Sequence, residues 1–477
     1  MIRMDSPHSD NTFIGRSSRM PPYTSVDSAF PLLTHRRLEQ GVASRNGDVR
    51  TVREFLASAR DLASHLPAKQ YAINLCRDRY HFLIAFTAAL ISQQVSLLPN
   101  CCAPEALAQL IERYPDAYVL ADHDDVLPDI SLCRVSDGIP TVDRRADIPA
   151  IPSEQVAVIV FTSGSSGVPR AHAKTWGALV RGAQALKRQF GIGNDDSHTM
   201  IGTVPAQHMY GMETTIMLPL QSGWIIHADH PVLPADVDEA VRKAGNPVWL
   251  MTTPFHLRAY VGQRTALPGL AGIISATMPL SRSLAANAED LWNVPVREIY
   301  GCTEGGMIGS RQPTATQAWT LCPGLQLWQE GDHAWVSGGH VGQSLRLADW
   351  ISVQSPTQFT LHGPHQDLVK VAGKRTSLAA LNAVLAQIEG VVDGTFYRPQ
   401  SSLSPNARLT AFVVAPGISA SMIQAELRKR IDPLFLPRPL HLVETLPRNP
   451  IGKLPQEWLS AFAMEMTSGI GSEKADS

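Results

Sequence analysis

The chain has 477 residues, of which 44% are hydrophobic and 18% are charged, and its formal net charge at neutral pH is −2. This composition is typical of a globular protein, and the length predicts two or three domains. The balanced charge, with no run of basic residues, argues against nucleic acid as the main partner. A nucleotide is not excluded, because it needs only a few local hydrogen-bond donors.

Three further features bear on location and membranes. The six cysteines form no CxxC pair and show no metal-site spacing to histidines, so we expect reduced thiols in a cytoplasmic protein. Residues 1–22 are polar and lack the apolar segment of a secretory signal, which predicts a flexible arm. The most apolar stretch, residues 82–91, is far shorter than the roughly 20 residues of a membrane-spanning helix. It predicts a buried helix and no membrane span.

Predicted strands and helices alternate through the first 310 residues. The apolar spacing between residues 30 and 66 predicts helix. Strands are then predicted at residues 71–75, 95–98, 117–121, 156–161, 200–204, 224–227, 248–252, 272–275 and 296–300. Helices are predicted at residues 80–92, 103–113 and 176–190. The alternation predicts a large layered α/β domain with mainly parallel sheets and helices on both faces.

After residue 309 the pattern changes to short strands separated by Gly, Asp, Pro and Ser. These strands, at residues 325–328, 334–337, 345–347, 350–353 and 359–361, predict an antiparallel sub-sheet. A second, α+β unit follows, with strands predicted at 368–371, 409–414 and 440–442 and helices at 377–388 and 421–431. We therefore predict a flexible arm (1–22), an N-terminal domain (23–362), a small C-terminal domain (363–465) and a disordered tail (466–477).

A loop rich in serine and glycine follows the predicted buried strand at residues 156–161. Its six residues are all small or hydroxylated: Thr162, Ser163, Gly164, Ser165, Ser166 and Gly167. The glycines allow a tight bend in which successive N–H groups converge on an anion, and the hydroxyls add further donors. The loop is therefore a candidate cradle for a polyphosphate. A solvated Ser/Gly turn is the alternative.

A second candidate stretch reads IYGCTEG at residues 299–305. Tyr300, at a predicted strand end, offers a flat ring on which a base can stack. Thr303 offers a hydroxyl, and Glu304 offers a carboxylate for a hard cation such as Mg²⁺. A strand-end turn with a solvated glutamate is the alternative interpretation.

Two more residues belong to the candidate site. Asp349 follows a predicted strand, and its two coplanar oxygens suit the hydroxyls of a ribose, although it also suits a turn. Lys453 lies in LPRNPIGKL at residues 446–454 and follows a flexible glycine, so its cationic arm can reach into a cleft. There it can neutralise charge that develops between an acid carboxylate and a phosphate. A surface lysine is the alternative.

Together these stretches resemble the adenylate-forming (ANL) superfamily of AMP-binding acyl-CoA synthetases, aryl acid ligases and peptide-synthetase adenylation domains. The resemblance spans roughly residues 70–460 and keeps the motif order of that family. It implies ATP and Mg²⁺ as cofactors, a mobile C-terminal domain, and an acyl-adenylate that is converted to a thioester. It also implies a small carboxylic acid as substrate, with CoA or a phosphopantetheinylated carrier as co-substrate.

The resemblance also assigns roles to individual residues. In the family the matching tyrosine packs on adenine, the threonine meets phosphate, the glutamate holds Mg²⁺ and the aspartate binds ribose. The implied catalytic residues are Lys453, Thr303, Glu304 and His208, which matches a gate beside the acyl pocket. The implied nucleotide-binding residues are Thr162, Ser163, Gly164, Ser165, Ser166, Gly167, Arg170, Tyr300, Gly301, Asp349 and Lys370. Lys370 lies in a region that contacts the carrier thiol in the second step, and residues 277–279 match a small-residue loop near adenine and acid.

Four positions depart from the family pattern. Arg170 replaces the usual lysine of the Ser/Gly loop, which keeps the charge and changes its geometry. Ala348 replaces the glycine before the ribose-binding aspartate. At the predicted hinge, Pro364 stands where arginine is usual and Gln366 where aspartate or lysine is usual. These changes remove a fork-shaped donor and stiffen one hinge bond, so ATP affinity and domain rotation are expected to differ from those of relatives.

The N-terminal half looks like the short ligases of aryl polyene and xanthomonadin-type pigment pathways. This favours loading of a hydroxybenzoate-like aryl acid onto an acyl carrier protein, and a fatty or cinnamic acid with free CoA is the alternative. A hydrolase is disfavoured because residues 164–167 do not form GxSxG. The loop is not a Walker A motif, since no Gly-Lys-Ser/Thr follows at the required spacing. A catalytically impaired nucleotide-binding relative is a third interpretation.

Overall fold

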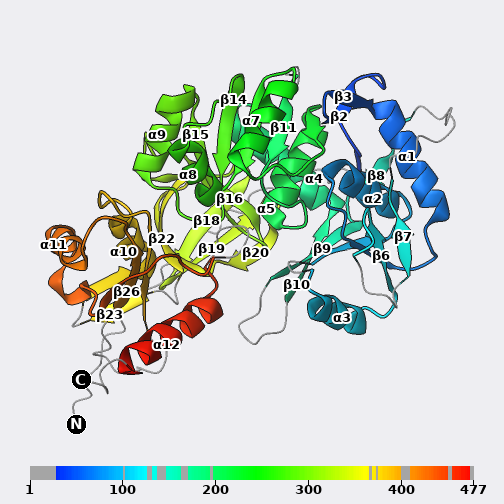
Figure 1. Ribbon diagram of the computed structural model, residues 1–477. Coiled ribbons are helices and arrows are strands. Elements are labelled where there is room, and N and C mark those ends of the chain that lie inside the picture. Colours follow the sequence, from blue (N-terminus) through cyan, green and yellow to red (C-terminus); the bar gives the residue numbers. More distant parts are fainter. Residues whose placement is uncertain are drawn as a thin grey trace, which may run out of the picture.

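The computed structural model describes residues 28–99, 102–125, 131–136, 147–162, 170–193, 197–364, 368–371, 374–398, 409–448 and 454–472. Two large sheets with their helices form the N-terminal domain, and a smaller α+β unit lies beside them (Figure 1). The predicted α/β class, with a large layered N-terminal domain and a small C-terminal domain, is confirmed.

The first sheet has six strands in the order β10-β9-β5-β4-β6-β7. Its strands are β4 (Tyr71–Asn74), β5 (Val95–Leu98), β6 (Ala117–Ala121), β7 (Leu132–Arg134), β9 (Val156–Thr162) and β10 (Arg170–Thr175). Neighbouring strands are parallel except for β9 and β10, which form an antiparallel hairpin at the sheet edge. The Ser/Gly loop connects these two paired strands, and its residues 163–169 lie outside the described part of the chain.

The second sheet has eleven strands in the order β21-β22-β17-β16-β15-β14-β13-β11-β12-β2-β3. Its parallel centre consists of β11 (Thr199–Gly202), β12 (Ile225–His227), β13 (Val248–Thr252), β14 (Leu270–Ser275) and β15 (Val296–Cys302). Antiparallel strands extend it on one side: β16 (Gly306–Arg311), β17 (Trp319–Leu321), β21 (Asp349–Ser355) and β22 (Gln358–Pro364). Because the central strands are parallel, their carboxyl ends lie along a single edge.

The helices of this domain pack against both sheets. They are α1 (Val52–His65), α2 (Arg79–Ile91), α3 (Pro104–Arg113), α4 (Trp176–Phe190), α7 (Pro234–Lys243), α8 (Pro254–Gly262) and α9 (Arg282–Trp292). The most apolar of them, α2, is buried along nearly its whole length, as predicted for residues 82–91. Among the described residues, no helix is long and apolar enough to cross a membrane.

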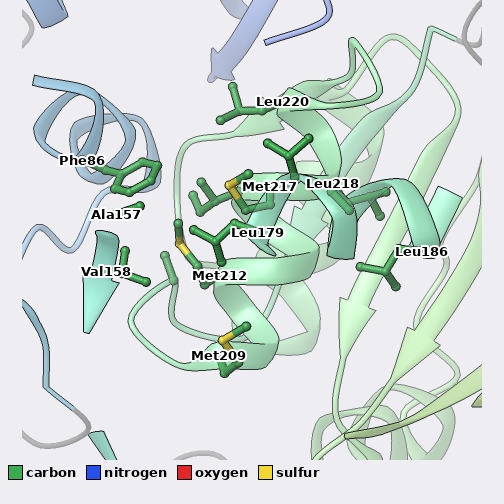
Figure 2. Packing of buried hydrophobic residues seen from close by; sticks show 14 of the residues in the cluster. Phe86, Ala157, Val158, Leu179, Leu186, Met209, Met212, Met217, Leu218 and Leu220 are labelled. Atoms are coloured by element: carbon green, nitrogen blue, oxygen red, sulfur yellow. The ribbon is translucent and has the colours of Figure 1, made fainter. Parts of the chain in front are cut away.

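One continuous helical segment between the sheets contains a π-helical stretch. It consists of α5 (Met209–Gly211), η1 (Met212–Met217) and α6 (Leu218–Leu220). Figure 2 shows its methionines and leucines beside the side chains of α4, α2 and β9; the labelled residues are Phe86, Ala157, Val158, Leu179, Leu186, Met209, Met212, Met217, Leu218 and Leu220. This cluster joins the two sheets through a shared hydrophobic core, so the segment is held from several sides.

Residues 30–51 form short strands joined by loops rather than the predicted helix. β1 (Ala29–Pro31) pairs with β8 (Ala150–Pro152), and β2 (Gly41–Arg45) forms a hairpin with β3 (Asp48–Thr51). Asn46 and Gly47 turn this hairpin with left-handed φ angles of 53° and 91°. An Asn-Gly pair between strands is the usual signal for such a turn, and the helical spacing obscured it. The helix begins only at Val52, where Thr51 and Glu54 form a reciprocal capping box.

Of the five strands predicted for an antiparallel sub-sheet, three form a separate antiparallel sheet: β18 (Leu325–Glu330), β19 (His333–Gly338) and β20 (Gly342–Arg346). The other two, β21 and β22, are antiparallel to each other but extend the second large sheet. The C-terminal unit contains β23 (Leu368–Val371), β24 (Lys374–Ser377), α10 (Leu378–Leu385), β25 (Asp393–Tyr397), β26 (Thr410–Val414), α11 (Ala420–Arg430), η3 (Pro433–Phe435), β27 (Leu440–Leu442) and α12 (Gln456–Ser472). This unit has its own hydrophobic core. Leu459 and Ala463 of α12 pack in a cluster with Phe412, and the helix continues to residue 472, where the sequence predicted a disordered tail from residue 466.

The predicted domain boundary at residues 362 and 363 falls inside a strand. β22 continues through it to Pro364, whose backbone lies opposite Asp349 in the pairing with β21. The hydroxyl of Ser377, which caps α10, donates a hydrogen bond to the His362 carbonyl. His362 in turn stacks on Trp350 with ring centroids 4.1 Å apart. The chain therefore enters the C-terminal unit from a strand that is paired and held on both sides.

Candidate active site

The stretch IYGCTEG lies where β15 ends at the carboxyl edge of the parallel strands. Residues 303–305 form the turn that joins β15 to the antiparallel strand β16. Thr303 is partly buried and Glu304 is exposed. Crevices at the carboxyl ends of parallel strands are the usual ligand sites of α/β sheets. The turn therefore places a hydroxyl and a carboxylate at a position suited to ligand binding.

Two glycines allow the strands to approach each other closely around this turn. A Cβ atom on Gly301 would overlap with the carbonyl oxygen of Gly306 across the hairpin. Gly306 itself has a φ of +71°, and a Cβ there would overlap with the Glu213 carboxylate. Both positions are therefore restricted to glycine. Cys302, between Gly301 and Thr303, accepts a hydrogen bond from the Gly305 N–H at 3.3 Å, and burial raises the pKa of its thiol to about 12, so it is not an available nucleophile.

The base of the Ser/Gly loop lies against this turn. Thr162 and Arg170 are cross-strand partners at the ends of β9 and β10. The Thr162 hydroxyl is 3.1 Å from His172 Nε2, and that nitrogen is 3.6 Å from a carboxylate oxygen of Glu304. The structure therefore brings together three predicted residues, Thr162, Arg170 and Glu304, through a histidine that was not predicted.

A buried lysine makes a second connection between the hairpin and the turn. Lys174, two residues beyond His172 on β10, donates a hydrogen bond to the Glu304 carbonyl. Its pKa is lowered by burial, and the negative charges of Glu213 and Glu304 oppose that shift. Burial also lowers the pKa of His172, while Glu304 acts in the opposite direction. The neutral imidazole is therefore favoured near neutral pH.

Tyr300 and Asp349 form the other end of the site. The phenol hydroxyl of Tyr300 donates to Asp349 Oδ2 at 2.6 Å. Tyr300 is 8% exposed, and burial together with the Asp349 charge raises its pKa well above the usual value, so the phenol keeps its proton. The two residues predicted to stack on a base and to accept a ribose are therefore in direct contact with each other.

The ring of Tyr300 rests on an aromatic cluster of the second sheet. It meets Trp319 and Phe359 edge to face, with centroids 5.8 Å and 5.9 Å away, and these two rings stack on each other. The guanidinium of Arg311 lies over the Trp319 ring, 4.6 Å from its centroid, and forms an ion pair with the buried Glu298 at 2.7 Å. Such contacts restrict the side chain of Tyr300 to one orientation.

Glu298 also supports the loop after β14. One of its carboxylate oxygens accepts the Leu280 N–H at 2.7 Å. In the same loop Thr277 has a φ of +78°, a strained conformation for a β-branched residue, and its hydroxyl is buried without a partner in the described contacts. Strain of this kind concentrates at binding sites, which agrees with the predicted position of residues 277–279 near the ligand.

His208 lies immediately before α5, and its carbonyl accepts the Met212 N–H at 2.7 Å. Gln207 donates to the Cys76 carbonyl at 2.8 Å, which anchors this segment to the first sheet. The Tyr210 hydroxyl reaches the carbonyls of Thr252 and Ile274 at the ends of β13 and β14. His208 is therefore held beside the carboxyl edge of the second sheet. No described contact joins it to Glu304, so its predicted role as a gate stays a prediction.

Several predicted residues fall outside the part that the structure describes. These are Lys453 and the loop residues Ser163, Gly164, Ser165, Ser166 and Gly167. Lys370 is present as a backbone position of β23, opposite Arg375, and its side chain is not described. The roles of these residues stay predictions from the sequence.

The predicted Mg²⁺ site consists of one carboxylate. Within the described ranges, no group of three or more His, Cys, Asp or Glu side chains could hold a metal ion. Mg²⁺ is commonly held by one or two carboxylates together with substrate phosphates and waters. The exposed Glu304, beside the base of the candidate phosphate loop, fits this pattern and does not need a cage of protein ligands.

Sequence reasoning missed His172, Lys174 and Glu213. Residues 170, 172 and 174 alternate along β10 and so share one face, which is a signal that Arg-Ala-His-Ala-Lys carries. Glu213 is a single charge within an apolar helical run, a pattern that indicates a buried polar partner. The partners themselves come from distant segments and could not be read from the sequence.

Comparison with known proteins places this geometry in a family. A family model described as AMP-binding enzyme matches residues 45–350, more than half of the chain. A 4-coumarate–CoA ligase from Rhodobacter capsulatus is 32% identical over 299 residues, which is 62% of this chain and 72% of the relative. Another from Halorhodospira halophila is 26% identical over 321 residues, 66% of this chain and 79% of the relative.

Solved structures agree in fold. O-succinylbenzoate coenzyme A synthetase from Bacillus subtilis, in complex with AMP, superposes with a TM-score of 0.75 at 16% identity, covering 88% of this chain and 95% of that one. The anthranilate CoA ligase AuaEII, in complex with anthranoyl-AMP, gives a TM-score of 0.72 at 14% identity, covering 92% and 99%. The family match, the shared fold and the assembled site lead to one conclusion: the chain belongs to the family of AMP-binding enzymes.

Proposed function

We propose that this enzyme is an AMP-forming acid–thiol ligase that joins an aromatic carboxylic acid to CoA. The observation that carries the proposal is the convergence of the hairpin and the turn. His172 Nε2 lies 3.1 Å from the Thr162 hydroxyl and 3.6 Å from Glu304, so the base of a polyphosphate loop and a carboxylate face the same place. The Tyr300–Asp349 pair supplies a nucleoside end to the same site.

In the first step, a carboxylate oxygen of the acid attacks the α-phosphorus of ATP. The bond from that phosphorus to the bridging oxygen breaks, and pyrophosphate leaves. The chain contributes positioning and electrostatic stabilisation, and no protein nucleophile is required. Thr303 and the Ser/Gly loop donate hydrogen bonds to phosphate oxygens, and Asp349 accepts the ribose hydroxyls. Lys453 neutralises charge between the acid and the α-phosphate.

In the second step, the thiol sulfur bonds to the carbonyl carbon of the acyl-adenylate, and the bond to the AMP oxygen breaks. The thiol proton passes to solvent. When bound, Mg²⁺ supplies positive charge to the phosphates, and Glu304 is the residue that would hold it. The exposed position of this carboxylate leaves room for substrate phosphates.

The choice of CoA and of an aromatic acid follows from the relatives. The 4-coumarate–CoA ligases among them favour a cinnamate-type or related aryl acid and a free CoA acceptor. The carrier-protein acceptor predicted from the sequence, with a hydroxybenzoate-like acid, has less support. It remains the second acceptor to test, because both acceptors present the same pantetheine thiol.

The test is ATP–pyrophosphate exchange with a panel of acids, followed by thioester formation. The panel is 4-coumarate, 4-hydroxybenzoate and octanoate, and the acceptors are CoA and a phosphopantetheinylated acyl carrier protein. We expect exchange with an aromatic acid and a thioester on CoA. Exchange with octanoate alone would overturn the aromatic substrate, and thioester formation only on the carrier would overturn CoA as acceptor.

A variant of the turn tests the site itself. Glu304→Gln keeps the size of the side chain and removes its charge, so we expect exchange to fall at least tenfold. Glu330→Gln, a substitution of an exposed glutamate in β18 that pairs with Trp328, is the matched control and should leave exchange unchanged. Equal activity of the two variants would contradict the role of Glu304.

A further inference from the structure

Three buried polar side chains support the turn at residues 303–305 from inside the protein. Lys174 of β10, Glu213 of η1 and His340, just after β19, are 8%, 6% and 7% exposed. They come from segments far apart in sequence. Each holds a backbone group of Glu304 or Met307, on either side of Gly305 and Gly306.

The hydrogen bonds of this group are directed at the backbone. Lys174 donates to the Glu304 carbonyl. Glu213 Oε1 accepts the Met307 N–H at 3.2 Å, and His340 Nε2 donates to the Met307 carbonyl at 2.8 Å. Since a carbonyl only accepts, His340 carries its proton on Nε2 here. Both polar backbone groups of Met307 are therefore fixed by side chains.

The buried carboxylate and ammonium also compensate each other. Burial raises the pKa of Glu213 to about 7, and the charge of Lys174 opposes that shift. An isolated buried charge is costly, so a buried pair of opposite charges that serves only stability could be replaced by apolar side chains at little cost. The position of both groups behind the turn that carries the proposed ligand-binding residues points to a role in placing that turn.

Local packing leaves Glu213 little freedom. A Cβ on Gly306 would overlap with its carboxylate, and a Cβ on Gly182 of α4 would lie 3.6 Å from the same oxygen. The segment that carries Glu213 is anchored by Met209, Met212 and Met217 in the core (Figure 2). Its π-helical turn sets the direction of the side chain, and such turns are frequent at functional sites.

We infer that Lys174 and Glu213, with His340, are positioning residues. They hold the β9–β10 hairpin and the Thr303–Glu304 turn in one fixed arrangement. Lys174 and His172 share one face of β10, so the strand that leaves the Ser/Gly loop contacts the turn twice. The distance between the described ends of the hairpin, at Thr162 and Arg170, and the turn is thereby fixed before the nucleotide binds. This inference rests on the proposed function of the turn in adenylation.

The experiment measures ATP–pyrophosphate exchange for Lys174→Met, Glu213→Met and Glu213→Gln in the full chain. Methionine keeps the bulk and removes the polar contact, whereas glutamine keeps an acceptor for the Met307 N–H. We expect Lys174→Met and Glu213→Met to lower kcat ten- to a hundredfold with the KM for the acid unchanged, because small displacements of reacting groups cost such factors. Glu213→Gln should recover most of the rate.

The double variant Lys174→Met/Glu213→Met tests whether the residues act as one unit. We expect a loss no larger than that of the worse single variant, rather than the product of the two losses. Lys243→Met, which removes the exposed ion pair with Glu239 on α7, is the control for loss of a lysine and should leave kcat unchanged. Thermal unfolding of each variant identifies any that fail to fold. If Glu213→Met does not fold, the kcat of Glu213→Gln is compared with that of Lys174→Met instead.

The outcomes separate this inference from the proposed function. Wild-type kcat and KM in both methionine variants would overturn the inference while Glu304→Gln still loses activity. A fall in total adenylation and thioester activity in proportion to the amount of folded protein, with kcat per folded molecule unchanged, would indicate a purely structural role. That result would also overturn the inference. Absence of exchange in the wild-type enzyme with every acid would instead overturn the proposed function.

Discussion

At the scale of single residues, the proposed nucleoside end of the site depends on one short hydrogen bond. The phenol of Tyr300 donates to Asp349 at 2.6 Å, and the aromatic rings of Trp319 and Phe359 restrict the phenol ring. A carboxylate that already accepts a strong hydrogen bond is held in one orientation. Asp349 can therefore present its other acceptor positions to a ribose without first losing side-chain freedom.

We predict that Tyr300→Phe and Asp349→Asn both raise the KM for ATP and leave the KM for the acid unchanged. The phenylalanine variant loses only the hydroxyl contact, so a three- to tenfold increase is expected, in line with about 1 kcal/mol for an ordinary hydrogen bond. Asparagine replaces the charged acceptor and should have a larger effect. Initial-rate exchange at varied ATP measures both. An equal rise in both KM values would contradict a role limited to the nucleotide.

The candidate residues differ in how far the sequence can reveal them. Tyr300, Thr303 and Glu304 lie within five positions, so their neighbourhood follows from one strand and one turn. Lys174 and Glu213 reach the same turn from separate segments, and their burial is a result of tertiary packing. No local pattern distinguishes a lysine that faces a buried carbonyl from one that faces water.

At the scale of elements, two antiparallel hairpins form the proposed phosphate side of the site. One joins β9 to β10 at the edge of the first sheet, and the other joins β15 to β16 in the second sheet. The side chains of His172 and Lys174 connect the hairpins across the space between the sheets. The sequence predicts β9 and β15, which are apolar. It did not predict β10, because an edge strand with alternating polar residues resembles a loop.

Glycine at position 306 is predicted to be essential for the second hairpin. In Gly306→Ala the new methyl group overlaps with the Glu213 carboxylate and the residue has a φ of +71°. Gly342→Ala is the matched control, since its φ is +72° and no heavy atom lies within 4 Å of the added Cβ. The backbone strain alone costs about 1–2 kcal/mol.

Thermal unfolding and exchange assays compare these two variants. We expect the alanine at 342 to lower the unfolding temperature slightly and to leave exchange intact. The alanine at 306 should lower it further and reduce exchange at least tenfold, because the carboxylate must move. Similar behaviour of the two variants would show that Glu213 accommodates the methyl group, which would weaken its assignment as a positioning residue.

At the scale of the whole molecule, a charged cluster lies between the two domains. Arg448 makes a bidentate pair with Asp393 at 2.7 Å and 2.8 Å in the C-terminal unit. Arg258 of α8, in the N-terminal domain, is shielded from solvent, which lowers its pKa, and Asp393 opposes that shift. The charge of Asp393 therefore acts on an arginine of each domain, and its hydrogen bonds go to Arg448. In the sequence, Lys453 follows Arg448 by five residues.

We predict that Asp393→Asn slows adenylate formation about tenfold, because the largely buried guanidinium of Arg448, five residues before Lys453, then loses its carboxylate partner. Thioester formation from a supplied acyl-adenylate should change less, and rapid-quench measurement of each half-reaction separates the two. Glu426→Gln removes the exposed pair with Lys429 on α11 and is expected to have no effect. An equal decrease in both half-reactions would argue against a specific role in the first.

Buried histidines predict a loss of stability in acid. Burial lowers the pKa values of His35, His227, His230 and His340 to about 4. Unfolded histidines take up protons near pH 6.5, so the stability that the neutral side chains contribute is lost as the pH falls from about 6.5 to about 4. Glu213, with its pKa raised to about 7, acts in the opposite direction over a similar range, and the four histidines outweigh it.

The unfolding temperature is therefore expected to fall clearly between pH 7 and pH 4.5. Replacement of His35 by Gln should reduce this dependence, since His35 is 3% exposed and its Nε2 lies 3.2 Å from the Trp224 carbonyl. His65→Gln, at an exposed position, serves as the control. An unfolding temperature that stays constant across this range would contradict the histidine assignment.

The sequence was sufficient to predict the α/β fold class but not the order of the strands within each sheet. Alternating strands and helices predicted a layered α/β domain, and the change of pattern after residue 309 predicted the antiparallel part. The strand order of the two sheets depends on crossovers between distant segments, for which the sequence has no local signal. The spacing of apolar residues at 30–51 suggested a helix, but the Asn46-Gly47 turn favours a hairpin there instead.

The hairpin of β21 and β22 has a thermodynamic consequence. Asp349, the proposed ribose acceptor, lies opposite Pro364, the last residue of β22. Two residues earlier on β22, the His362 carbonyl accepts a hydrogen bond from Ser377, the cap of α10. Nucleotide affinity and the orientation of the C-terminal unit are therefore both expected to depend on these few residues. By linkage, whatever factor one orientation adds to nucleotide affinity, bound nucleotide must add to the population of that orientation. In the proposed mechanism, replacement of ATP by AMP during turnover would then change the preferred orientation of the C-terminal unit.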